Sequence, residues 1–168
     1  MTTKAIIKLG ISSCLLGNPV RYDGAGKLDN HILDTFGSLV EFVPICPEVE
    51  SGMPAPREPM QLAGDVVKPR LITIETRIDR TDELTRWITD KLRELEQAGI
   101  CGFILKARSP SCGVHDTEFF SPEGESLGRR AGLFAEAVMI RFPSLPVEDE
   151  EALRDHEILE RFIKRIKA

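Results

Sequence analysis

Three of the four cysteines, Cys14, Cys46 and Cys112, each follow a short apolar stretch and lie close to glycine, proline or serine residues. Cysteine thiolates are ligands typical of zinc and of iron–sulfur clusters. Cysteine is also common as a small buried hydrophobic residue. Because the sequence contains no C-x-x-C pair, the spacing alone leaves both interpretations open.

The apolar stretches before these cysteines, residues 5–11, 39–45 and 102–106, each predict a short buried strand. The carboxyl ends of parallel strands meet at one rim of a sheet, and ligands of α/β proteins bind at that rim. We therefore expect the three thiols to converge despite their separation in the sequence. Cys101 precedes its strand, so we expect it at the opposite rim, where it serves as a packing residue.

The segments around the cysteines also have the composition of site loops. Small residues flank the cysteine in both Ser12-Ser-Cys-Leu-Leu-Gly17 and Ser109-Pro-Ser-Cys-Gly113, so backbone amides can approach a bound group. The motif Cys46-Pro-Glu48 places a carboxylate two residues from a cysteine, and the rigid proline ties the two together. We expect Glu48 to face the site and Glu50 to be a solvated surface acid.

The elements that must position these residues follow from periodicity and from glycine and proline. Residues 12–27 predict a loop, and residues 46–69 predict a long structured loop because prolines are frequent there. Apolar spacing predicts helices at residues 28–36, 82–98, 128–142 and 149–167, and further strands at residues 70–75 and 145–147. Strands that alternate with helices predict an α/β fold: a single domain over residues 1–168, with a mostly parallel, Rossmann-like sheet covered by helices on both faces.

Composition excludes several classes of function. The 168-residue chain is 42% hydrophobic and 29% charged, with a formal net charge of -5, which argues against a general nucleic-acid-binding protein. No apolar run approaches the roughly 20 residues needed to span a bilayer, so we expect no membrane partner. Four cysteines without a secretion signal favour a cytoplasmic protein with free thiols or metal ligands.

Taken in order, several motifs resemble the DUF523 family, to which the thiouracil desulfidases belong. They are Cys14-Leu-Leu-Gly17, Arg21-Tyr-Asp-Gly24, Cys46-Pro-Glu48, Pro56-Arg-Glu-Pro59 and Ser109-Pro-Ser-Cys-Gly113. The resemblance covers nearly the whole chain and implies one α/β domain that holds a [4Fe-4S] cluster. It implies that Cys14, Cys46 and Cys112 bind three irons while the fourth iron stays open, and that Glu48 and Ser109 are catalytic. Ser109 could equally be only a cap or turn hydroxyl.

The chemistry that such a site performs is non-redox desulfuration. A thiocarbonyl sulfur on the open iron is polarised, water adds to its carbon, and C=O replaces C=S with release of sulfide. The expected substrate is a small thio-heterocycle such as 2-thiouracil, with Arg21, Tyr22, Asp23 and Lys106 as candidate binding residues; Asp23-Gly24 could equally form only a turn. The alternatives are a non-enzymatic redox sensor or cluster carrier, and a zinc hydrolase of nucleobases. The sequence does not indicate the oligomeric state.

Overall fold

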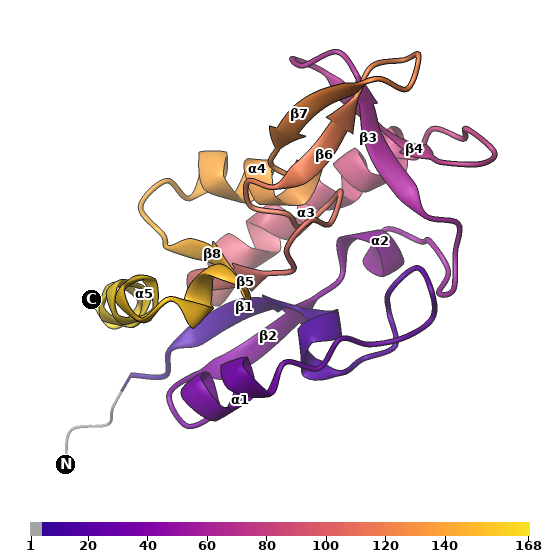
Figure 1. Cartoon of the computed structure of the whole chain (residues 1–168). Helices are drawn as coiled ribbons and strands as arrows, with labels where there is room; N and C mark the ends of the chain where they lie inside the picture. Colours follow the sequence, from indigo (N-terminus) through magenta and orange to yellow (C-terminus); the bar gives the residue numbers. More distant parts are fainter. Residues whose placement is uncertain (1–4) are drawn as a thin grey trace.

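A parallel sheet of four strands forms the centre of the protein, whose computed structural model describes residues 5–168 (Figure 1). Its order is β2 (Glu41–Ile45), β1 (Lys8–Ser12), β5 (Ile100–Leu105) and β8 (Val147–Asp149), and every neighbouring pair is parallel. The predicted α/β class and parallel sheet are therefore confirmed. Residues 1–4 of the domain predicted over residues 1–168 lie outside the described residues.

Helices cover both faces of this sheet, as predicted. Side chains of a strand alternate between its faces, so Leu9 and Ile11 pack with α1 (Asn30–Phe36) and α5 (His156–Ile166). Phe103 and Leu105 pack on the other face with α3 (Thr81–Ala98) and α4 (Leu133–Arg141). Within the described part of the chain, no helix has the length and apolar character needed to cross a membrane.

A second sheet, which the sequence did not predict, packs beside the first (Figure 1). Its order is β4 (Pro69–Thr73), β3 (Met60–Gly64), β6 (Thr117–Phe120) and β7 (Ser126–Arg130). The central pair β3–β6 is parallel and the two outer pairs are antiparallel. The predicted strand at residues 70–75 belongs to this sheet, not to the parallel one.

The expectation that residues 46–69 contain no regular structure was wrong. This segment forms the short helix α2 (Pro47–Glu50) and then β3. Pro47 occupies the first position of α2, where a missing N–H removes no intrahelical hydrogen bond. The prolines therefore shape the connection between the two elements without preventing either.

Two predicted helices begin later than expected. Strand β7 takes residues 126–130, so the helix predicted from residue 128 begins at Leu133. The helix predicted from residue 149 is preceded by the end of β8 and by the turn η2 (Ala152–Arg154). The Asp155 side chain accepts hydrogen bonds from the amides of Glu157 and Ile158, and this cap sets the start of α5.

Candidate metal centre and substrate cavity

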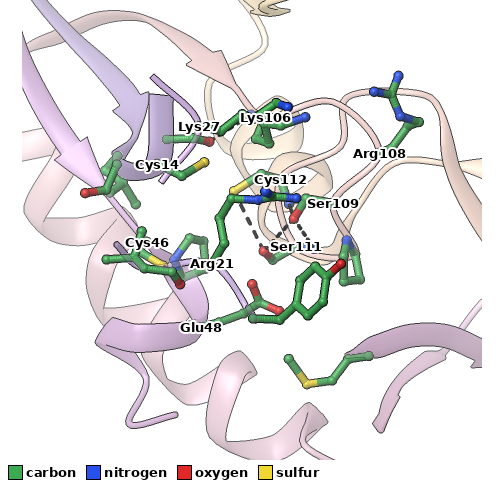
Figure 2. Close-up of a pocket in the computed structure, with 18 of the residues that line it drawn as sticks. Cys14, Arg21, Lys27, Cys46, Glu48, Lys106, Arg108, Ser109, Ser111 and Cys112 are labelled. Atoms are coloured by element: carbon green, nitrogen blue, oxygen red, sulfur yellow. Dashed lines mark hydrogen bonds between the residues drawn. The ribbon is translucent and has the colours of Figure 1, made fainter. Parts of the chain in front are cut away.

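A cavity of about 420 Å³ opens at the carboxyl-terminal rim of the parallel sheet, and Cys14, Cys46 and Cys112 all line it. Cys14 lies in the 3₁₀ turn η1 (Ser13–Leu16) after β1, Cys46 directly after β2, and Cys112 in the loop after β5. Figure 2 shows their sulfur atoms around one side of this space. Cys101 lies at the amino end of β5 and is not among the lining residues. The structure thus brings together the three cysteines that the strand pattern grouped.

The loop that carries Cys112 is held by its own hydroxyl groups. Ser109 Oγ accepts the Cys112 amide at 3.1 Å, and Ser111 Oγ lies 3.7 Å from Cys112 Sγ. Gly113 is required there because a Cβ at this position would lie 2.0 Å from Thr117 Oγ1. The Ser111 carbonyl also accepts the amide of Phe134 at 2.9 Å, which joins the loop to the start of α4. Ser109 therefore has a clear structural role as a turn hydroxyl beside the cavity.

The turn that carries Cys46 is fixed from the core side. Glu50 Oε2 accepts the Cys46 amide at 2.7 Å, and Glu50 Oε1 lies 3.2 Å from Lys91 Nζ. The Lys91 side chain is only 9% exposed. The expectation that Glu50 is a solvent-exposed acid is confirmed, but its two carboxylate oxygens also hold this turn in place. Glu50 stands one residue beyond the N3 position of a capping box, so no standard sequence signal predicts this contact.

Burial disfavours the deprotonated, negatively charged form of the three thiols when no metal is bound. It raises the pKa of Cys14 to about 11, although Lys106 opposes the shift. Burial also raises the pKa of Cys112 to about 12, with a smaller contribution from the negative charges of Cys46 and Cys14. The pKa of Cys46 is raised by the same cause. Three buried thiols whose charges would repel one another are stabilised as thiolates by a bound cation or cluster.

The three sulfur atoms are not arranged as the ligands of a single tetrahedral zinc ion. Three thiolates at about 2.3 Å from a tetrahedral zinc would lie about 3.8 Å from one another. Among the described residues, the three cysteines are not a group whose ligand atoms all lie within 4.8 Å of one another. The donor set and the cavity therefore suit an iron–sulfur cluster, whose ligands surround several metal ions.

Glu48 lies on α2 with its carboxylate at the cavity wall (Figure 2). Its side chain is 13% exposed, and its Oε2 atom lies 3.0 Å from Nη2 of Arg57. Burial raises the pKa of the Glu48 carboxyl group, while the charge of Arg57 and its hydrogen bond lower it. The Glu48 Oε1 atom accepts no hydrogen bond from the described residues, which leaves one oxygen for a ligand or a water molecule.

Comparison with known proteins agrees with this geometry. A sequence model of the family described as 2-thiouracil desulfurase matches residues 9–150. The chain belongs to the 2-thiouracil desulfurase family. The solved structure of the [4Fe-4S]-dependent thiouracil desulfidase TudS is similar, with a TM-score of 0.72, 32% sequence identity, and coverage of 94% of this chain and 99% of that chain.

A curated relative of the chain is the uncharacterized protein YbbK of Bacillus subtilis (strain 168). The two are 28% identical over 136 residues, which cover 76% of this chain and 89% of YbbK. Membership of the 2-thiouracil desulfurase family confirms the expected enzyme family and the resemblance from which it came.

The four predicted substrate-binding residues of this family member differ in their surroundings. Arg21, Tyr22 and Lys106 line the cavity. Lys106 Nζ is already paired with buried Glu150 at 2.9 Å, so its charge is held at the wall. Asp23 lies outside the lining residues and accepts the amide of Ala25 at 3.0 Å, which is the turn interaction that the sequence left open.

Sequence reasoning missed two cations that hold the site in this 2-thiouracil desulfurase family member. Arg57 lines the cavity and pairs with Glu48, and Lys91 pairs with Glu50. Arg57 stands in one of the family-like motifs, but no spacing rule connects it with Glu48. Lys91 lies on the buried face of α3, at a position that its charge alone would place in solvent.

Proposed function

We propose that this protein is an iron–sulfur-dependent desulfidase that replaces C=S by C=O in a small thio-heterocycle of the 2-thiouracil type and releases sulfide. The observation that carries the proposal is the convergence of three cysteines, but not the fourth, on one cavity that Glu48 also lines. Three protein ligands leave one iron of a [4Fe-4S] cluster without a cysteine.

In this proposal Cys14, Cys46 and Cys112 hold the cluster. When bound, the cluster supplies an open iron that acts as a Lewis acid toward a thiocarbonyl sulfur. The segments that carry Cys112 and Cys46 are held rigidly by Ser109 and Glu50, which favours a preformed site. The cavity volume of about 420 Å³ lies in the range of small-molecule sites and favours a catalyst over a cluster carrier.

The residues of the chain supply the proton transfers. Glu48 Oε1 is the oxygen free to take a proton from a water molecule as that water adds to the thiocarbonyl carbon. The same carboxyl group can return this proton to the sulfur, then take the second proton from the added hydroxyl group as C=O forms and pass it to the departing sulfur. The overall change is thiocarbonyl plus water to carbonyl plus hydrogen sulfide. No electrons are gained or lost, and no reductant is needed.

The remaining residues orient the substrate. Ser109 Oγ accepts the amide of Cys112 and lies 3.1 Å from Ser111 Oγ, so its O–H can donate to a substrate atom in exchange for that contact. Arg21 contributes hydrogen-bond donors and Tyr22 contributes an aromatic ring, and both lie in the loop between η1 and α1. Lys106 contributes positive charge, which stabilises sulfide or an anionic form of the heterocycle.

The decisive experiment is an anaerobic turnover assay on protein reconstituted with iron and sulfide. We expect equal amounts of sulfide and uracil from 2-thiouracil in the absence of any electron donor. Protein loaded with zinc in place of the cluster serves as the control and is expected to be inactive. Release of sulfide only with a reductant, or turnover by the zinc form, would exclude this mechanism.

A cluster carrier would give a different result in the same experiment. It would transfer iron and sulfide to an added apo-ferredoxin and leave 2-thiouracil unchanged. Retention of the cluster in the presence of the acceptor, together with sulfide release from substrate, supports the enzyme.

A further inference from the structure

One buried side chain at the cavity has no role in the proposed reaction and has unusual hydrogen bonding. Arg57, in the connection between α2 and β3, is only 7% exposed although it carries a guanidinium group. Its backbone amide donates to the Tyr22 carbonyl at 2.7 Å. An arginine buried to this extent is uncommon unless its charge is paired.

The guanidinium joins three segments that border the cavity. Nη2 donates to Glu48 Oε2 at 3.0 Å, and Nη1 donates to the carbonyl oxygens of Val20 at 2.9 Å and Pro54 at 3.1 Å. The Val20 carbonyl also lies 3.9 Å from Cys46 Sγ. Arg57 therefore fixes Glu48 relative to the loop before Tyr22 and relative to one of the cysteines.

A further donor of the group, Nε, is buried and has no hydrogen-bond partner among the described residues. A buried N–H without a partner is unfavourable, and native structures contain few of them. In this orientation Arg57 leaves Nε unpaired while it holds Glu48 Oε2 and Val20 together. Glu48 Oε1 is left without a partner from the described part of the chain.

We propose that Arg57 is the positioning residue for Glu48: it holds one carboxylate oxygen so that the other faces the thiocarbonyl carbon. This inference rests on the proposed function. The planar fork of arginine reaches Glu48 and Val20 at the same time, whereas a lysine ammonium presents one compact charge and cannot reproduce both bonds at their present geometry.

The test is Arg57→Lys, which keeps the charge and removes the fork. A displaced carboxylate lowers the rate of the chemical step, so we expect kcat to fall by about tenfold to a hundredfold, with KM changed by less than about threefold. Iron and acid-labile sulfide per chain should stay at the wild-type level. Arg70→Lys is the matched control, because it alters an exposed pair with Asp79 at 2.7 Å outside the cavity and should leave kcat unchanged.

A double-mutant cycle with Glu48→Gln separates positioning from a merely structural role. If Arg57 acts through Glu48, Arg57→Lys should change the rate of the Glu48→Gln variant by less than about twofold in single-turnover assays. Thermal unfolding of the cluster-free proteins tests the same coupling without an activity assay. Arg57→Lys should lower Tm less in the Glu48→Gln variant than in the wild type.

The possible outcomes are distinct. An unchanged kcat for Arg57→Lys, or the same rate loss in both backgrounds, overturns the inference. Equal Tm losses in both backgrounds also overturn it, because the pair would then not be formed. Wild-type protein that releases no sulfide overturns the proposed function instead, whatever the Arg57 variants do.

Discussion

The two rims of the parallel sheet place the same residue type in two different settings. At the carboxyl rim, Cys14, Cys46 and Cys112 line a cavity together with charged residues and backbone amides. At the amino rim, Cys101 packs against the hydrophobic core, as expected, and its Sγ lies 3.7 Å from the carbonyl of its near neighbour Gly99. Loops that leave the carboxyl ends of parallel strands converge, so they can build a site from distant segments. The comparison shows that the rim at which a cysteine lies decides whether it lines the cavity.

The largest effect should come from removing a thiol at the carboxyl rim. We expect Cys112→Ala to lose most of its cluster, because the loss of one of three ligands removes metal-binding free energy and leaves two buried thiols. Iron and acid-labile sulfide per chain after anaerobic reconstitution measure the effect. Cluster content equal to wild type would show that Cys112 is not a ligand.

The next largest effect should come from Glu48, a residue at the same rim that we expect to affect the reaction rate and not cluster binding. We expect Glu48→Gln to keep the cluster and to release sulfide about a hundredfold to ten-thousandfold more slowly, because the amide cannot take a proton from water. Initial rates of sulfide release from 2-thiouracil, divided by cluster content, give this number. A variant as fast as wild type would remove Glu48 from the reaction.

A smaller effect should come from the support behind the carboxyl rim. Lys91→Met leaves Glu50 without its buried partner and loosens the turn that carries Cys46. We expect a loss of about 1.5–3 kcal/mol in the free energy of unfolding, the range for a hydrogen bond to a charged group.

Urea unfolding of the cluster-free protein measures this loss. The control is Arg93→Ala, because Arg93 and Asp90 lie at 4.0 Å on the exposed side of the same helix and such pairs contribute little. If both variants unfold at the same urea concentration, Lys91 does not support the turn.

The smallest effect is expected at the amino rim. Cys101→Ala should change cluster content and turnover by less than about twofold and the free energy of unfolding by about 0.5 kcal/mol or less, because the side chain is partly exposed. The same assays compare it with Cys112→Ala. Loss of the cluster in the Cys101 variant would contradict the proposal that only the cysteines at the carboxyl rim bind it.

The sequence by itself indicated the central sheet and most of its site. Apolar stretches placed β1, β2 and β5 to within a few residues, and the helical spacing from Leu84 to Leu95 placed α3 almost completely. These elements bury one face or both, so their hydrophobic period is visible locally. The grouping of three cysteines followed from the order of strands and loops.

Only the tertiary structure decided the second sheet and the charge partners. Strand β7 has no buried alternation and β3 is flanked by proline and glycine, so their pairing depends on neighbours that the local sequence does not contain. The pairs Glu48–Arg57 and Glu50–Lys91 join α2 to two separate segments; the fold buries most of the first pair and the lysine of the second. The sequence shows which charged residues are able to form ion pairs. The fold decides which ion pairs form, because only folding brings these segments together.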